Sequence, residues 1–93
     1  MNDSYKMQII MKNAIIDYYL EEIGTAITID NVYVVWYCKT LQNHKALLST
    51  VNEDGLYFEC TYNGDKEEMY LDVYEKIKNK AINSKRFNDK IDF

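Results

Sequence analysis

Residues 32–40 read Val-Tyr-Val-Val-Trp-Tyr-Cys-Lys-Thr, and this stretch decides the fold class. β-Branched and aromatic side chains fill it, and such residues favour a β-strand. Both sides of the strand are largely apolar, which predicts a central strand that is covered on two sides. Strict alternation places Val32, Val34, Trp36 and Cys38 on one side, and Tyr33, Val35, Tyr37 and Lys39 on the other.

Two more strands are predicted after this one. Gln42-Asn43-His44 is typical of a turn, and residues 45–51 then form the second strand. The loop 52–55 ends in Gly55, which suits the positive φ of a tight hairpin. Residues 56–62 alternate apolar and polar side chains and form the third strand. Because the strands follow one another closely, we expect an antiparallel meander.

Helices are predicted on both sides of this meander. Apolar residues recur at helical spacing between residues 4 and 23, and Gly24 supplies a stop signal. Residues 25–30 form a connector or a short edge strand. Asp65 and Glu68 have the spacing of a capping box, which predicts a second helix from Asp65 to about residue 82.

The predicted fold class is therefore α+β, with an N-terminal helix, a three-stranded antiparallel meander and a C-terminal helix packed on the sheet. We expect one domain over residues 1–93, in which the polar tail 83–93 is either ordered or flexible. The longest apolar run, residues 32–38, has seven residues, whereas a membrane span needs about 20. We expect no membrane contact and a cytoplasmic location, with Cys38 and Cys60 as free thiols.

Few residues in the chain could carry catalysis or bind a metal. His44 is the single histidine, and the two cysteines lack the close spacing of a zinc site. The chain has three glycines and neither of the glycine-rich phosphate-binding loops. We therefore expect no enzymatic activity, no metal and no cofactor.

The first predicted helix is apolar on two sides. Ile9, Ile16 and Leu20 fall roughly opposite the stripe that is expected to face the sheet. Either the C-terminal helix or tail covers these three residues, or they form an interface with a second copy or with a partner protein.

The net charge of −4 is distributed unevenly. Residues 17–75 carry twelve acids and three bases, whereas residues 76–93 carry six bases and two acids. The candidate acidic patch consists of Glu67, Glu68, Asp72 and Glu75, and the candidate basic patch of Lys78, Lys80, Lys85 and Arg86.

Each patch has an ordinary interpretation and a functional one. Both are ordinarily solvated surfaces, whose signs also suit the two ends of a helix dipole. The acidic patch would otherwise imitate a phosphate backbone, and the basic patch would contact the phosphates of a nucleic acid. The overall acidity of the chain disfavours nucleic acid as a partner.

Three stretches of the sequence carry a family resemblance: residues 34–43 (Val-Val-Trp-Tyr-Cys-Lys-Thr-Leu-Gln-Asn), 45–50 (Lys-Ala-Leu-Leu-Ser-Thr) and 62–66 (Tyr-Asn-Gly-Asp-Lys). They resemble small uncharacterised proteins encoded by phages and prophages of low-GC Gram-positive bacteria. The resemblance covers residues 32–80 and implies no site residue. It implies a context in which small proteins without catalytic motifs bind and redirect a host protein.

The favoured hypothesis is a phage-encoded accessory protein that binds a host protein without catalysis and modulates it, with a homodimer as one assembly. Tyrosine and tryptophan, which are suited to interface cores, support this hypothesis. The alternative is an acidic inhibitor that mimics nucleic acid and blocks a defence nuclease, of the anti-CRISPR or anti-restriction type. The second alternative is nucleic-acid binding through the basic C-terminal segment.

Overall fold

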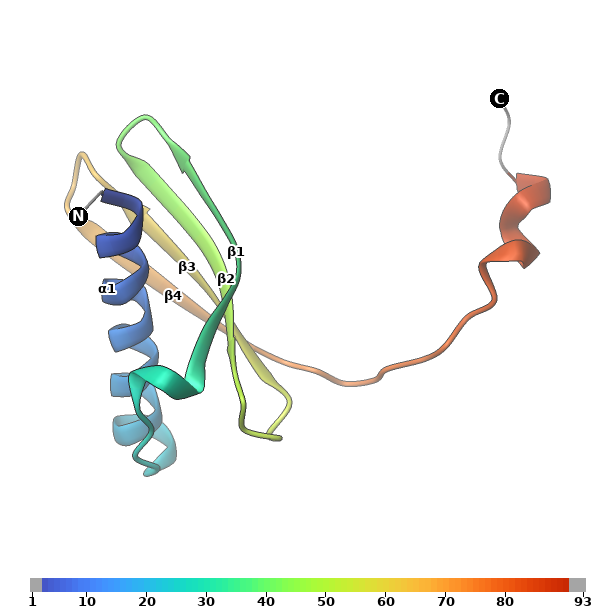
Figure 1. Ribbon diagram of the computed structural model, residues 1–93, viewed down its shortest axis with the longest axis horizontal. Coiled ribbons are helices and arrows are strands. Elements are labelled where there is room, and N and C mark those ends of the chain that lie inside the picture. Colours follow the sequence, from blue (N-terminus) through green and yellow to red (C-terminus); the bar gives the residue numbers. More distant parts are fainter. Residues whose placement is uncertain (1–2, 91–93) are drawn as a thin grey trace.

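The computed structural model describes residues 3–90, so residues 91–93 of the predicted tail lie outside it. Helix α1 (Asp3–Tyr18) precedes a sheet of four strands, and it lies along one side of that sheet (Figure 1). The α+β class is thus confirmed. The strands are β1 (Val32–Thr40), β2 (Asn43–Thr50), β3 (Leu56–Asn63) and β4 (Glu68–Glu75), and the short helical segments are η1 (Tyr19–Ile23), η2 (Ile29–Asn31) and η3 (Ser84–Lys90).

The first helix ends where the sequence predicts. The last turn, η1, has π-helical geometry, and the chain then leaves the helix at Gly24 with a φ of 80°. The N–H of Gly24 donates to the carbonyl of Tyr19, which satisfies one of the carbonyls left free at a helix end. The following residues are a connector that contains η2 and no strand, so the chain passes directly from helix to sheet.

The predicted second helix is wrong, because residues 68–75 form strand β4. The side chain of Asn63 accepts hydrogen bonds from the N–H groups of Asp65 (3.1 Å) and Lys66 (3.3 Å) and closes a turn there. Asp65 therefore does not open a helix. The chain reverses and β4 pairs with the free edge of β3, so that the meander gains a fourth strand in the order β1-β2-β3-β4.

The core lies between α1 and the side of the sheet that faces it. Phe58 is at its centre, since the rings of Tyr18 and Tyr19 each lie 5.8 Å from the Phe58 ring, centroid to centroid. Burial of such side chains contributes about 1.5–3 kcal/mol each and fixes α1 on this side. The fully buried apolar residues are Met11, Ile15, Tyr19, Val32, Ala46, Leu48, Phe58 and Cys60.

The β1–β2 and β3–β4 turns meet at one end of the sheet. The N–H of Gly64 donates to the side-chain oxygen of Asn43 at 3.1 Å, and the side chain of Gln42 donates to Asp65. A Cβ atom on Gly64 would lie 2.2 Å from the carbonyl oxygen of Gln42. Only glycine allows the two turns to approach so closely.

The chain after β4 leaves the body of the molecule, which we define as residues 3–75. Residues 76–83 have no regular structure and η3 follows, at a distance from the sheet (Figure 1). No C-terminal helix packs on the sheet within the described chain, in contrast to the prediction. The radius of gyration is 16.7 Å, against about 12 Å for a compact chain of this length. Across residues 3–90 no helix is long and apolar enough to cross a membrane.

Candidate functional site

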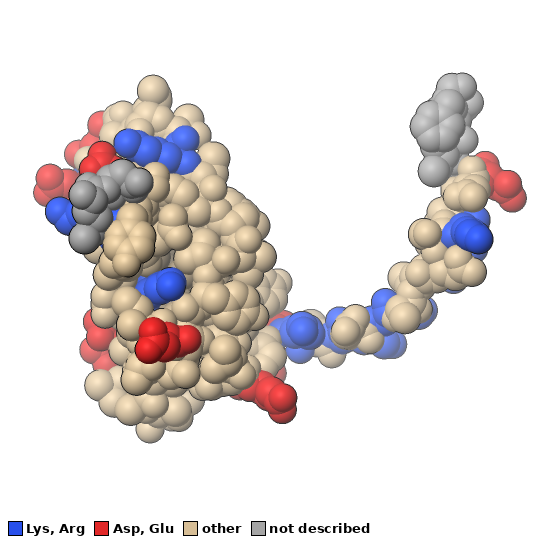
Figure 2. All heavy atoms as spheres, viewed as in Figure 1, with Lys and Arg blue, Asp and Glu red and all other residues tan. Residues whose placement is uncertain are grey.

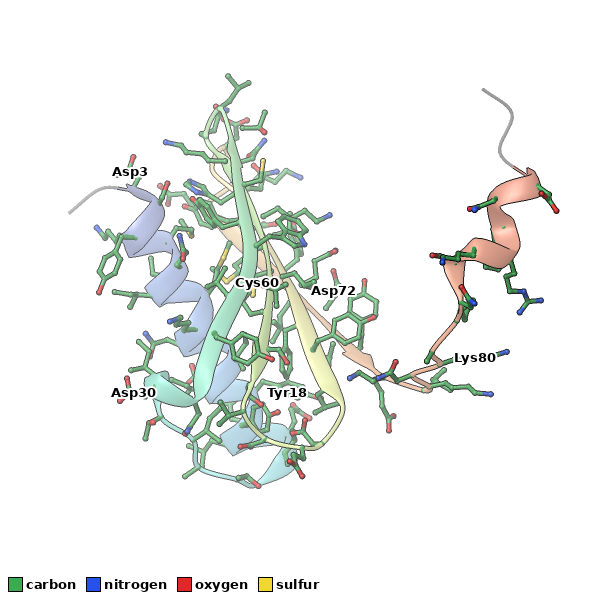
Figure 3. The ribbon with its side chains drawn as sticks, turned by 45° about the vertical axis from the view of Figure 1, so that its right-hand side comes forward. Asp3, Tyr18, Asp30, Cys60, Asp72 and Lys80 are labelled. Carbon is green, nitrogen blue, oxygen red and sulfur yellow. The ribbon has the colours of Figure 1, made fainter. Side chains whose placement is uncertain are left out.

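One side of the sheet is left uncovered by any described element of the chain. We call this side the open face. Figure 1 shows α1 on the opposite side, and Figure 3 shows Asp72 projecting from the side away from α1. The side chains that alternate onto the open face are Tyr33, Trp36, Cys38, Lys45, Leu47, Ser49, Tyr57, Glu59, Thr61, Glu68, Tyr70, Asp72 and Tyr74.

A β-bulge in β1 places Trp36 on the open face. Val34 is paired with Leu48 and Trp36 with Leu47, so Val35 is an extra residue in β1. The extra residue inverts the alternation of the strand beyond it. Trp36 therefore points away from the core, on the side opposite Val34, and is 43% exposed. The strict alternation predicted for residues 32–40 is wrong from Val35 onward.

Tyrosines extend this aromatic surface across the sheet. The rings of Tyr57 and Tyr74 stack at a centroid distance of 5.2 Å with an interplanar angle of 16°. Tyr33, Tyr70 and Tyr74 are between 41% and 48% exposed. Large, rigid aromatic side chains that remain half-exposed on a flat surface are the kind of residue that anchors protein interfaces.

The charged residues of the open face are mainly acidic. Lys45 pairs with Glu59 at 3.4 Å. Glu59 also lies directly across from Asp72 on the neighbouring strand, and like charges in that position are destabilising. The Glu68 carboxylate accepts a hydrogen bond from the Tyr70 hydroxyl, which raises the pKa of that tyrosine. A basic ligand would relieve the acidic surplus around Asp72.

Two hollows indent this surface. The first, of about 380 Å³, is mostly apolar and includes Trp36, Cys38, Lys45 and Thr61 in its lining. The second, of about 650 Å³, lies toward the β2–β3 loop and is lined in part by Tyr33, Tyr57, Glu53 and Lys76. Both are open to solvent and shallow, so they suit side chains of a partner better than an enclosed small molecule.

The predicted helix interface is only partly exposed. Ile16 is half-buried and packs against the core, and Ile9 is half-buried as well. Leu20 is 59% exposed, on η1. The structure therefore leaves Leu20 as the most accessible of the three predicted interface residues.

The predicted acidic patch is divided by the change from helix to strand. Glu68 and Asp72 share the open face, whereas Glu75 alternates to the other side of β4. Glu67 lies in the preceding turn with a φ of 52°. Glu59 lies across from Asp72 and so joins Glu68 and Asp72 on the open face, a position that is fixed by register and not by sequence distance.

The predicted basic patch lies on the segment 76–90, which we call the tail. Lys78 and Lys80 are exposed on its extended part, and Lys85 and Arg86 on η3. Figure 2 shows that lysine and arginine recur along the tail, outside the body. The Arg86 guanidinium lies 5.2 Å from the centre of the Phe87 ring.

The cysteines and the histidine do not form a nucleophilic site. Cys60 is buried in the core, and burial raises the pKa of its thiol to about 12, which makes the thiolate scarce. Cys38 is exposed on the open face. His44, predicted in a turn, belongs to β2 and is buried between Tyr37 and Tyr62 on the core side. Its Nδ1 is hydrogen-bonded to the Tyr37 hydroxyl, and burial lowers its pKa.

Metal ligation has no evident site in the part of the chain that the structure describes. Among residues 3–90, no three His, Cys, Asp or Glu side chains are grouped so that they could hold an ion. The chemistry available on the open face is therefore that of aromatic stacking, apolar contact and ion pairing.

Fold and surface thus define a small α+β protein with one uncovered, aromatic and acidic sheet face. The chain belongs to a family of unknown function (DUF6275), whose model matches residues 8–84. The match begins within α1 and continues to the first residue of η3, and so extends beyond the residues on which the resemblance rests. No curated protein matches the chain, and no solved structure matches it either.

Proposed function

We propose that this protein binds another protein without catalysis, and that the open face is its binding surface. The observation that carries the proposal is the half-exposed Trp36, which lines an apolar hollow on the uncovered side of the sheet. Interface hot spots are enriched in tryptophan and tyrosine, and they cluster where partner side chains fill pockets. The resemblance to phage and prophage proteins suggests that the protein is phage-encoded and modulates a host protein.

The chemistry of the open face favours a partner segment that is both basic and apolar. Glu59, Glu68 and Asp72 supply negative charge, and Lys45 is already paired with Glu59. Aromatic side chains flank these carboxylates, so an aliphatic or aromatic side chain from the partner would be buried beside each ion pair. Charges at such a surface mainly steer association and fix orientation.

The acidic mimic of nucleic acid is a second candidate on the same surface. The cross-strand pair of Glu59 and Asp72 favours it, because it places two carboxylates directly opposite each other on the open face. If it is correct, binding weakens steeply with salt and depends on Asp72 more than on Trp36. If the first proposal is correct, Trp36 dominates and the dependence on salt is shallow.

The test compares two large hydrophobic residues of equal exposure on opposite sides of the molecule. Trp36 and Ile10 are both 43% exposed, on the open face and on α1 respectively. Tagged wild type, Trp36→Ala and Ile10→Ala chains are used to capture proteins from a low-GC Gram-positive lysate. We expect one captured protein to be lost with Trp36→Ala and kept with Ile10→Ala.

Direct binding is then measured with the purified captured protein. Trp36 is the single tryptophan, so a chain labelled with 5-fluorotryptophan gives a ¹⁹F signal from this site alone. We expect that signal to shift on binding, and Trp36→Ala to weaken binding about 30-fold or more. Equal binding by wild type and Trp36→Ala would overturn the proposal. Loss of binding with Leu20→Ala instead would assign the interface to the helix side.

A further inference from the structure

The tail has the composition of a binding segment, and beyond Lys76 its described residues make no hydrogen bond to the body. Residues 76–90 carry six basic residues and one acid. Three of their apolar side chains are left in solvent, with Ile77 97%, Ile82 53% and Phe87 40% exposed. In the described chain, the last hydrogen bond between tail and body joins the Lys76 N–H to the Gly55 carbonyl at 2.7 Å.

The open face and the tail are complementary in charge and in apolar character. The face offers Glu59, Glu68 and Asp72 among aromatic rings, together with two shallow hollows. The tail offers lysines among isoleucines. The tail therefore has the basic and apolar side chains that we inferred for a partner of the open face.

The lengths also agree. An eight-residue strand such as β3 or β4 is about 26 Å long. The eight residues 76–83 span up to about 28 Å when they are extended. The extended part of one tail can therefore cross the whole open face along the strands.

The geometry where the tail leaves β4 favours binding of the tail to the open face of a second copy over binding to the open face of its own chain. The hydrogen bond from Lys76 to Gly55 continues the direction of β4, and the tail then runs away from the sheet (Figure 1). A return onto the same face would need a tight reversal directly after Lys76. The chain has no proline and no glycine after Gly64 to favour one.

We infer that the protein forms a dimer in which residues 77–87 of each copy lie on the open face of the other. Such an exchange is reciprocal, so both tails are buried at once and a two-fold symmetric assembly closes. The inference rests on the proposed role of the open face as a protein-binding surface, and it names a second copy of this chain as a partner.

The test measures the oligomeric state of the full chain when charges are reversed on the open face, on the tail, or on both. Sedimentation equilibrium is measured for wild type, for Asp72→Lys, for Lys78→Glu with Lys80→Glu, and for all three substitutions together. We expect wild type to be a dimer. Charge reversal on the face alone or on the tail alone should raise the dimer dissociation constant at least tenfold. The three substitutions together should restore dimerisation. Asp17→Lys, on the exposed side of α1, makes the same change in net charge as Asp72→Lys and should leave the dimer intact.

A disulfide trap checks the location independently of affinity. Cys38 is exposed on the open face, so Ile82→Cys is expected to give a crosslink between Cys38 of one copy and position 82 of the other. Peptide mapping identifies the linked positions, and Cys38→Ser with Ile82→Cys is the control that should lose this link. Mild oxidation of correctly folded protein is sufficient for the assay.

Each outcome supports or overturns the inference. A wild-type chain that stays monomeric at several hundred micromolar overturns it. A dimer whose dissociation constant is unchanged by the charge reversals, and which gives no disulfide to Cys38, overturns it as well. Binding of single-stranded nucleic acid by the tail, lost with Lys78→Glu and Lys80→Glu in a monomeric chain, would assign the tail to that ligand. The proposed function fails separately, when Trp36→Ala still captures and binds the external protein.

Discussion

Replacement of Tyr19 by phenylalanine removes one oxygen atom from a buried contact between the helix and the sheet. The Tyr19 side chain is 1% exposed, and its hydroxyl donates to Asp54 and lies 3.2 Å from the hydroxyl oxygen of Thr50. Phenylalanine retains the ring and its contact with Phe58. The substitution thus isolates the polar link between the end of α1 and the β2–β3 loop.

At pH 7 the expected cost is about 1–2 kcal/mol in the free energy of unfolding. A hydrogen bond to a charged group contributes about 1.5–3 kcal/mol. Asp54 is itself exposed, so water replaces part of what it loses. Thr50 still accepts from the N–H of Asn52 at 3.2 Å, and no buried oxygen is left without a partner there.

At high pH we expect Tyr19→Phe to become more stable than wild type. Burial first, and then the hydrogen bond to Asp54, raise the pKa of Tyr19 from 10.0 to about 12. Because the folded-state pKa is above the unfolded one, the stability that depends on neutral Tyr19 is present below pH 10 and is lost as the pH rises from 10 to 12. A difference of two pKa units corresponds to about 2.7 kcal/mol.

The measurement is urea unfolding followed by far-UV circular dichroism, from pH 7 to pH 11.5, for wild type and Tyr19→Phe. We expect wild type to be more stable at pH 7, the gap to close above pH 10, and Tyr19→Phe to become the more stable chain near pH 11.5. Tyr33→Phe, which removes an exposed hydroxyl, should stay within about 0.5 kcal/mol of wild type at pH 7. Parallel curves for wild type and Tyr19→Phe across this range would refute the reasoning.

Three further outcomes are expected. Gly64→Ala should destabilise the chain by at least about 1–3 kcal/mol, because its Cβ would lie 2.2 Å from a Gln42 backbone oxygen, and an unchanged melting temperature would contradict this. Burial lowers the pKa of His44, so stability should be complete above pH 6.5 and fall below it, and His44→Gln should flatten that part of the profile in urea unfolding. Ellman's reagent should modify Cys38 in the native protein and reach Cys60 only in denaturant; rapid native reaction of both thiols would show that the core is open.

Local signals were sufficient to predict the first half of the fold. Gly24 ends the helix with the positive φ that glycine favours, and Gly55 has a φ of 75° in the β2–β3 loop. The β-branched and aromatic residues 32–40 form β1 over the predicted range, but β1 lies at an edge of the sheet, so the prediction of a central strand is wrong. Each of these features depends on residues that are adjacent in the sequence.

Residues 68–75 were wrongly predicted as a helix because their apolar pattern fits both the helical period and the alternation of a strand. Met69, Val73 and Tyr74 recur at helical spacing, yet Met69, Leu71 and Val73 also alternate as one side of a strand. The choice depends on β3, whose free edge offers a full ladder of backbone hydrogen bonds to β4. The side chain of Asn63 meanwhile holds the turn that a capping box at Asp65 would have replaced. Neither fact is visible within the segment itself.

The bulge at Val35 left no trace in the sequence for a similar reason. Residues 32–37 are apolar or aromatic throughout, so an inverted alternation changes no hydrophobic pattern. Register with β2 decides which side Trp36 takes, and the paired residues of β2 lie on the far side of a turn. A run that is apolar on both sides specifies a strand but not its facing.

These two unpredicted features together create the open face. The bulge turns Trp36 outward, and the change from helix to strand both adds Tyr70, Asp72 and Tyr74 to that side and removes the helix that was expected to cover it. A sheet side with this much aromatic surface gains stability when it is covered, and the body supplies one helix, which is already committed to the core. If the open face is covered, its cover comes from the tail or from another molecule. The separation of the basic tail from the acidic sheet favours the exchange between two copies that we propose.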